Sequence, residues 1–463
     1  MKAALTTVGR GPPANPEEVT MTEPAGRRWP RTLVAVGLAV AAVAVPPTVV
    51  GVTRAKAYLS SLYEPPRDTT APVTAPPYDP AKPTVVVLLG NEGAHVGDVL
   101  GPHETFAATG AFNVYTVAPE RKLVTLLGGL DLVPDFSFAE LDARLAGAAP
   151  QVVAVPQLPD AAPAARERLN AWLVRQAGNG ALVLGVCIGA EVVASAGLLA
   201  GRDATSHWFR LGKLEQRYPE VRWLRATRYV DDGDVITTGG VLSGIDGALR
   251  VIERRLGTAA ATGAANAVGW THYSPGTPAP LPRSSFGPRD TIAGVNLTFR
   301  PRPTIGVVVT DGIGEIELAS IFATYTEAAY AARTVTLGAG STAPVRTRHG
   351  LVFVPRGDAF AVSVDRLLVP GAAAHRLQGL DAEYPHAQPG FAFDLALRDM
   401  ARTIDVPTAR WRAKTLEYPL SDPDLTGAGW PWLPTLLPFL YALLIVALAI
   451  VALRRRNTVR SRP

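Results

Sequence analysis

Cysteine is almost absent from this chain of 463 residues, in which Cys187 is the only one. A single thiol excludes an intramolecular disulfide framework. Lysine is also scarce, with six residues among abundant arginine, alanine, glycine and proline. This composition is typical of a GC-rich bacterial genome. The formal net charge of +5 is small for this length, so we do not expect a nucleic-acid-binding surface.

Two kinds of site are also missing from the sequence. The seven histidines are scattered, and none stands at the spacing of a metal site. The stretch Gly90-Asn91-Glu92-Gly93 lacks the G-x-G-x-x-G form of a phosphate-binding loop. The sequence therefore predicts no bound metal and no cofactor.

Two long uncharged apolar runs are present, at residues 32–52 and 433–453. Each is about long enough to span a bilayer as a helix. Arginines lie on the outer side of both runs, which by the positive-inside rule predicts cytoplasmic termini. We expect a two-pass protein of the cell membrane, with a disordered tail over 1–31 and a basic tail over 454–463.

Each apolar run has an alternative interpretation. The first is also compatible with a cleaved signal peptide, since Ala55-Lys56-Ala57 resembles a cleavage site. The second is also compatible with a buried core helix. If both runs span the membrane, residues 53–430 lie outside the cytoplasm, and the lipid bilayer is a partner of the chain.

Between the runs, residues 53–83 are rich in proline and threonine and predict an extended stalk. From residue 84 to residue 256, apolar strands alternate with helical periodicity. The expected strands are 84–89, 112–117, 152–155, 181–186 and 234–238, and the expected helices 98–110, 161–177, 188–198 and 242–256. This alternation predicts an α/β sandwich with a parallel sheet covered on both faces.

The pattern then partly repeats. Residues 257–303 are rich in alanine, glycine and proline, which predicts a linker or a loosely packed extension. Residues 304–418 follow as a degenerate second unit, with strands over 304–309, 334–337 and 366–371, a helix over 311–330 and a last helix over 391–403. The two units are expected to pack as an internal pseudo-dimer, unless the whole chain forms a homodimer.

The stretch from Ala181 to Glu191 is the most informative part of the chain. A buried strand stops abruptly and turns into a helix, with Cys187 at the turn. Such a turn holds its side chain at the carboxyl edge of the sheet, where open α/β folds bind ligands. The alternative is a buried cysteine that only fills space.

Several motifs in this region resemble one family. They are Asp98-Val99-Leu100-Gly101-Pro102-His103-Glu104, Val117-Ala118-Pro119-Glu120-Arg121, Val186-Cys187-Ile188-Gly189-Ala190, Ala196-Gly197-Leu198-Leu199-Ala200-Gly201-Arg202, Ala204-Thr205-Ser206-His207-Trp208 and Val230-Asp231-Asp232-Gly233-Asp234. Over residues 84–256 the chain resembles the ThiJ/PfpI (DJ-1/PfpI) superfamily, and among its branches the sensor domain of AraC-type transcriptional regulators. The resemblance implies the class I glutamine amidotransferase-like, flavodoxin-like fold. The second unit resembles the same branch, with Arg410-Trp411 and Leu416-Glu417-Tyr418-Pro419 similar to its tail.

The resemblance implies three site residues. Cys187 takes the place of the nucleophile, Asp98 that of the acidic residue near it, with Glu317 as its counterpart in the second unit, and His207 that of an assisting histidine. The alternative for Asp98 is a carboxylate that only faces the dipole at a helix start. The alternative for His207, which precedes Trp208, is a packed structural histidine. A cysteine at a helix N-terminus has a lowered pKa, which favours the thiolate. His95 and His103 could line the same pocket.

The chain also departs from hydrolytic members of the family. Ile188 replaces the histidine that follows their cysteine, and Pro156-Gln157-Leu158 replaces the Gly-Gly loop that donates to an oxyanion. The sequence therefore predicts a membrane-anchored module that senses a small molecule or binds a protein, with little or no catalysis. The alternative is a Cys-dependent hydrolase, amidase or glyoxalase-like enzyme. The second unit and the last apolar run stand where the regulators carry their DNA-binding domain, so nucleic acid is not an expected partner.

Overall fold

The computed structural model describes residues 31–66, 76–371, 376–418 and 425–460. Residues Pro47–Tyr441 form one compact unit. The predicted tail over 1–31 lies almost wholly outside the described residues, and most of the tail over 454–463 is described only as backbone helix.

The main sheet has seven strands in the order β10-β11-β7-β6-β1-β2-β5. Its strands are β1 (Thr84–Leu88), β2 (Asn113–Ala118), β5 (Phe136–Ser137), β6 (Val152–Val155), β7 (Leu182–Gly185), β10 (Tyr229–Asp232) and β11 (Val235–Thr238). All neighbouring pairs are parallel except β10 with β11. The predicted parallel α/β sheet is therefore confirmed, and each predicted strand lies within a residue or two of an observed one.

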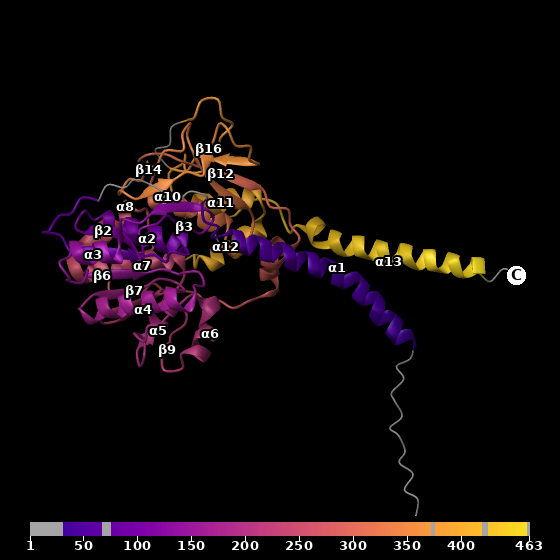
Figure 1. Cartoon of the computed structure of the whole chain (residues 1–463), viewed down its shortest axis with the longest axis horizontal. Coiled ribbons are helices and arrows are strands. Elements are labelled where there is room, and N and C mark those ends of the chain that lie inside the picture. Colours follow the sequence, from indigo (N-terminus) through magenta and orange to yellow (C-terminus); the bar gives the residue numbers. More distant parts are fainter. Residues whose placement is uncertain (1–30, 67–75, 372–375, 419–424, 461–463) are drawn as a thin grey trace, which may run out of the picture. The chain divides into compact units, whose positions relative to one another are not determined.

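Helices cover both faces of this sheet, because its central strands of valine and leucine are buried on both sides. α2 (Val96–Ala107) and α7 (Val241–Leu256) lie on one face, and α4 (Pro163–Gly178) and α5 (Gly189–Ser195) on the other (Figure 1). The shorter elements around them are α3 (Phe138–Arg144), β8 (Asp203–Ala204), α6 (Trp208–Arg217) and β9 (Arg222–Trp223).

A second sheet has four parallel strands in the order β16-β13-β12-β17. The strands are β12 (Thr304–Val309), β13 (Arg333–Gly338), β16 (Gly357–Asp358) and β17 (Arg366–Leu368), and α10 (Glu315–Tyr325) connects the first two. This order matches β5-β2-β1-β6 of the main sheet, strand for strand in chain order. After β17 the chain continues to α11 (Ala392–Thr403) and α12 (Val406–Thr415), without a strand–cysteine–helix turn.

A third sheet contains strands from both regions. Its order is β14-β15-β4-β3, from β3 (Val124–Leu126), β4 (Leu130–Val133), β14 (Val345–Arg346) and β15 (Val352–Val354). The central pair is antiparallel, with Phe353 opposite Leu132. α2 and α10 also pack against each other. The two α/β regions therefore share a continuous interface.

Two predicted connections differ from the structure. The predicted stalk over 53–83 begins instead inside α1 (Arg31–Ser61), where Tyr58 is buried and its hydroxyl donates to the Ala332 carbonyl at 2.7 Å. The predicted linker over 257–303 contains α8 (Thr258–Ala267), the 3₁₀ turn η1 (Pro288–Thr291) and α9 (Ile292–Thr298). Tyr58 of α1, Ala264 of α8 and Ile292 of α9 are buried, so these described parts of both segments pack onto the body of the protein.

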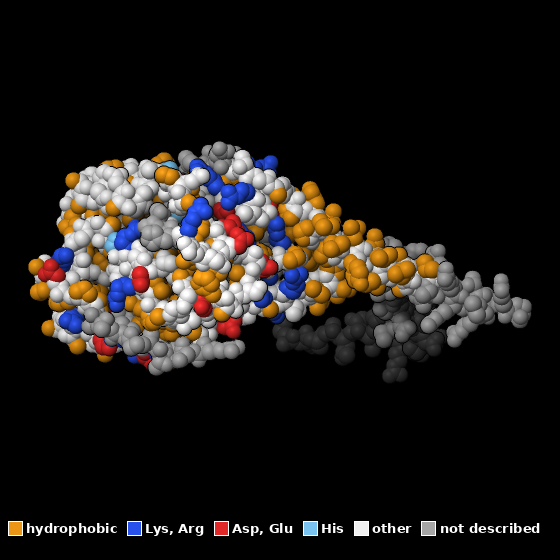
Figure 2. All heavy atoms as spheres, turned by 90° about the horizontal axis from the view of Figure 1, so that it is seen from above, with side chains coloured by type: hydrophobic (Ala, Val, Ile, Leu, Met, Phe, Trp, Pro, Cys, Tyr) orange, Lys and Arg blue, Asp and Glu red, His pale blue; other side chains and the backbone are white. Residues whose placement is uncertain are grey.

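One helix among the described residues is long and apolar enough to cross a membrane, over Trp432–Val451 within α13 (Trp432–Arg460). Figure 2 shows how densely apolar side chains cover this part of the molecule. The first apolar run, 32–52, lies in α1 and does not meet the same criterion, so a two-pass arrangement is not supported by the helices themselves.

Candidate functional site

The turn at Cys187 is a strained elbow between β7 and α5. Cys187 has φ of +57°, a left-handed conformation that costs energy for a residue with a side chain. Gly189 follows because a Cβ there would lie 2.0 Å from the Val155 carbonyl oxygen of the neighbouring strand. The Cys187 N–H donates to Thr238 Oγ1 at 3.2 Å, and Ser206 Oγ donates to the Cys187 carbonyl at 2.9 Å. The elbow is thus fixed from three sides.

The thiol at this elbow is protonated at neutral pH. Cys187 is only 4% exposed. Burial raises the pKa of the thiol well above its ordinary value, and the negative charges of Asp98, Glu417 and Glu327 raise it further. A backbone hydrogen bond from Ile188 opposes this shift only partly. The expectation that the start of α5 lowers the thiol pKa is therefore wrong, because burial and carboxylates outweigh a helix of seven residues.

Asp98 lies in the first turn of α2 and is fully buried. Its Oδ2 accepts a hydrogen bond from the Gln157 N–H at 3.1 Å. This N–H belongs to the loop that replaces the Gly-Gly loop, so it is engaged with Asp98. Asp98 Oδ1 has no hydrogen-bond partner among the described residues, although His95 Nδ1 lies 3.3 Å away.

His95 connects Asp98 to the second α/β region. Its Nε2 lies 3.0 Å from Glu327 Oε2, and Gln157 Nε2 donates to Glu327 Oε1 at 3.1 Å. Burial lowers the pKa of His95, but Asp98 and Glu327 outweigh burial and raise that pKa to about 9. Burial raises the pKa of Glu327, but the hydrogen bond and charge of His95 lower it to about 2. His95 therefore lies between two carboxylates that raise its pKa, and its Nδ1 also accepts a hydrogen bond from the Asp98 N–H at 3.3 Å as the N-cap of α2.

Two further buried groups near Cys187 have unused hydrogen-bonding atoms. Arg412 of α12 is 2% exposed, and its Nε and one terminal nitrogen have no partner among the described residues. Burial lowers the pKa of Arg412 to about 10, against the opposing charges of Glu327 and Asp98. The hydroxyl of Tyr63 is likewise buried and unpartnered. Buried donors of this kind are normally satisfied by water or a ligand.

His207 uses both ring nitrogens in structural contacts. Its Nε2 lies 2.9 Å from the Thr415 carbonyl, and its Nδ1 accepts from the Phe209 N–H at 3.4 Å as the N-cap of α6. With Nε2 donating to the carbonyl, His207 ties α6 to the end of α12. To act as a general base, His207 would first have to break these contacts.

Glu417 links the elbow to the second region. It is buried, with φ of +56°, and its carboxylate accepts from the Gly240 N–H and from Ser243 Oγ at the start of α7. The Glu417 carbonyl accepts from the buried Arg228 at 3.0 Å, and Arg228 pairs with Asp246 at 3.1 Å. A negative charge at a helix N-terminus is stabilising, so Glu417 fastens the end of the second region onto α7.

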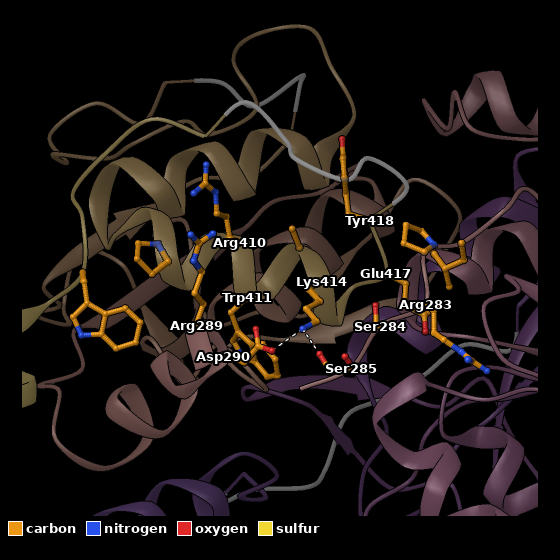
Figure 3. Close-up of a pocket in the computed structure, with 15 residues that line it drawn as sticks. Arg283, Ser284, Ser285, Arg289, Asp290, Arg410, Trp411, Lys414, Glu417 and Tyr418 are labelled. Atoms are coloured by element: carbon orange, nitrogen blue, oxygen red, sulfur yellow. Dashed lines mark hydrogen bonds and ion pairs between the residues drawn. The ribbon is translucent and has the colours of Figure 1, made fainter. Parts of the chain in front are cut away.

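A cavity of about 710 Å³ adjoins Glu417. Figure 3 shows Lys414 between Asp290 and Ser285, to which its ammonium donates at 2.6 Å each. The other charged and aromatic lining residues are Arg283, Arg289, Arg410, Trp411, Tyr418 and Trp430. Four cations and two carboxylates line the cavity, so its wall is positively charged overall.

The structure brings together only some of the residues identified from the sequence. Asp98 lies near Cys187, and Glu317 takes the third position of α10 as Asp98 does in α2. Glu327, Arg412 and Tyr63 were not identified, since no motif marks them. Glu417 belongs to the motif Leu416-Glu417-Tyr418-Pro419, which resembles the tail of the family. This motif was the sequence feature that could have indicated that the second region reaches this site.

The fold and the elbow define an α/β protein with a cysteine at the carboxyl edge of a parallel sheet. The DJ-1/PfpI family profile matches residues 83–254. Isonitrile hydratase from Pseudomonas putida is 30% identical over 162 residues, covering 35% of this chain and 67% of the hydratase. The chain belongs to the DJ-1/PfpI family.

Transcriptional regulators share this domain. The HTH-type regulator GlxA of Rhizobium meliloti (strain 1021) is 40% identical over 74 residues, covering 16% of this chain and 22% of the regulator. The crystal structure of an AraC family transcriptional regulator from Pseudomonas putida aligns with a TM-score of 0.34 and 18% identity, over 40% of this chain and 98% of that one. The chain thus spans less than a quarter of the length of GlxA.

Proposed function

We propose that this chain is a membrane-anchored DJ-1/PfpI module that binds a small anionic molecule and has little or no catalytic activity. The proposal rests on the burial and the raised pKa of the Cys187 thiol. This thiol is buried and surrounded by carboxylates, so it is a poor nucleophile at neutral pH. The Gln157 N–H, at the position of an oxyanion donor, is engaged with Asp98.

We further propose that residues 304–418 are a degenerate second copy of the first half of the domain. The matching strand orders and the shared sheet support this proposal. In this arrangement the copy is an internal partner, which contributes Glu327, Arg412 and Glu417 around the first copy's cysteine. No DNA-binding role is proposed.

The anchor is proposed to be α13, whose apolar side chains are mostly exposed. The first apolar run, 32–52, is proposed as a second span. The arginines outside both runs support cytoplasmic termini and an extracytoplasmic globular region.

Thiol reactivity tests the proposal. Cys187 is expected to react with iodoacetamide at pH 7 more slowly than free cysteine, because little of it is thiolate. Asp98→Asn removes one negative charge beside the sulfur and is expected to speed the reaction, by about tenfold for each unit that the pKa falls. The rate is measured by mass spectrometry on the folded full chain, with Cys187→Ser as the unlabelled control. Labelling of the unmodified protein as fast as free cysteine would contradict the proposal.

The ligand site is proposed to be the cavity of Figure 3, since its lining is cationic and carries three aromatic rings. Succinate is expected to change the fluorescence of Trp411 and Trp430 saturably. Arg289→Ala is expected to weaken this binding roughly tenfold, the value of a hydrogen bond between charged groups. Arg166→Ala, on the surface of α4, should have no effect. Equal succinate affinities of the Arg289→Ala and Arg166→Ala variants would show that the cavity is not the anion site.

The second candidate function is a Cys-dependent hydrolase, amidase or glyoxalase-like enzyme. The strained elbow and the nearby Asp98 favour it, as does the similarity to isonitrile hydratase. In that case Cys187 is the nucleophile and Asp98 the acidic partner, and His207 would have to release the Thr415 carbonyl to assist as a base. Rapid alkylation of Cys187, together with loss of turnover in Cys187→Ser, would support this function over the first.

A further inference from the structure

A second polar cluster is buried at the interface of the two α/β regions, apart from the cysteine. Glu104 comes from α2, Glu315 begins α10, and His349 lies in the turn between β14 and β15. One ligand atom from each of these three residues lies within 4.8 Å of the other two. Residues more than 200 positions apart therefore present three metal-binding groups to one point.

The groups in the cluster are held firmly. His349 Nδ1 lies 2.8 Å from Glu315 Oε2 and 3.9 Å from Glu104 Oε1. The other Glu315 oxygen accepts from Thr347 Oγ1 at 2.6 Å, and Glu104 Oε2 accepts from the Ile316 N–H at 2.5 Å. These hydrogen bonds to the carboxylate oxygens fix the orientation of both side chains, as hydrogen bonds to metal ligands do in metal sites.

His103 is an independent sign that a ligand belongs here. It is 0% exposed, and neither ring nitrogen has a hydrogen-bond partner among the described residues. Its Nδ1 lies 3.9 Å from Glu315 Oε1, so the ring borders the cluster on the side of Glu315. An imidazole buried without partners is costly, and coordination to a cation would satisfy it.

A route from solvent leads to the cluster. His103, Arg348 and His349 line an open cavity of about 730 Å³. Arg348 contacts Glu104 Oε1 at 3.2 Å and Glu317 at 3.3 Å, and its side chain is 44% exposed. A cation that enters would replace the positive charge of Arg348 beside Glu104. Because Arg348 is exposed, its side chain has room to move into solvent at that point.

We propose that Glu104, Glu315 and His349, with His103 as a further ligand, bind a divalent transition-metal ion that joins the two α/β regions. Two carboxylates and two imidazoles are ligands that Zn²⁺ accepts in a four-coordinate site. The ion takes the place of the proton between His349 Nδ1 and Glu315, so binding releases protons. The site differs from the elbow in residues and position, and the proposal does not depend on the function of Cys187.

Metal binding is tested on the full chain in detergent after removal of metal with a chelator. Titration with ZnCl₂ by calorimetry is expected to show one tight site per chain, with release of protons, and the melting temperature should rise on addition of Zn²⁺. Glu104→Gln and His349→Ala are each expected to weaken binding by roughly tenfold or more. His272→Ala, at a histidine outside the cluster, is the matched control and should leave binding unchanged.

Folding of the variants is checked in the metal-free state. Glu104→Gln removes one of two adjacent buried carboxylates, so its metal-free melting temperature should be at least that of the unmodified chain. Absence of stoichiometric Zn²⁺ and Mn²⁺ binding to the unmodified protein would overturn the proposal. Equal Zn²⁺ affinity in Glu104→Gln, His349→Ala and the control would also overturn it, because the ion would then bind elsewhere.

Discussion

Gly189→Ala is expected to destabilise the protein by at least about 3 kcal/mol, at the upper end of overpacking costs. The added Cβ would meet the Val155 carbonyl oxygen at 2.0 Å and the carbonyl carbon at 2.8 Å. Both are backbone atoms of β6 in the middle of the main sheet, and the Val155 carbonyl also accepts the Val186 N–H at 2.8 Å. Relief of the clash therefore requires either a shift of a central strand or opening of the elbow.

The measurement is denaturant unfolding of the full chain in detergent, followed by far-ultraviolet circular dichroism. Gly263→Ala is the matched control. Gly263 lies within α8, and a Cβ there meets no atom within 4 Å. This substitution is expected to stabilise the protein by about 0.5–1 kcal/mol through helix propensity. Unfolding midpoints that agree between Gly189→Ala and the unmodified chain would show that the elbow is not held against β6.

The second large effect is a loss of stability between about pH 6.5 and pH 9. The pKa of His95 is raised to about 9 in the folded protein by Asp98 and Glu327, against burial, and is about 6.5 in the unfolded chain. The folded state therefore binds this proton more tightly. Its contribution is complete below pH 6.5 and is lost as the pH rises through 9, by an amount on the order of 3 kcal/mol.

The unfolding free energy is measured from pH 6 to pH 9.5 for the unmodified chain and for His95→Gln. Glutamine keeps a donor toward Glu327 but has no titrating proton. The difference in unfolding free energy between the unmodified chain and His95→Gln should fall as the pH rises over this range. Other groups that titrate there are present in both proteins, so their effects cancel in this difference. A difference that stays constant with pH would contradict the raised pKa of His95.

Much of the main sheet could be predicted from the sequence, because its strands are continuous apolar runs. In the main sheet Val152–Val155 agrees with its predicted bounds, and in the second sheet Thr304–Val309 does so as well. The hairpin of β3 and β4 was not predicted, since its strands have three and four residues and β4 completes its pairing with β15, far along the chain. Local periodicity carries no information about such a partner.

The candidate site was predictable only where a local motif marked it. The turn after a buried strand marked Cys187, whereas Asp98 was identified through the resemblance of the Asp98–Glu104 stretch to a family motif. The sign of the thiol pKa shift was not predictable, because burial of the sulfur raises the pKa most, and Asp98, Glu417 and Glu327 raise it further. Both the burial and the approach of Glu417 and Glu327 are tertiary features that no local motif marks. For His207 the sequence left open a base at the elbow or a packed structural histidine, and its ring contacts the Thr415 carbonyl and the Phe209 N–H of α6.

The sheet that joins β4 to β15 also has a consequence for biosynthesis. The free edge of β4 cannot be paired until residues 352–354 have left the ribosome, about 220 residues later. At roughly 5–20 residues per second, this leaves the edge open for roughly 10–45 seconds. An unpaired edge is a template for aggregation, so each nascent chain passes through an interval in which a holding chaperone would favour the correct pairing.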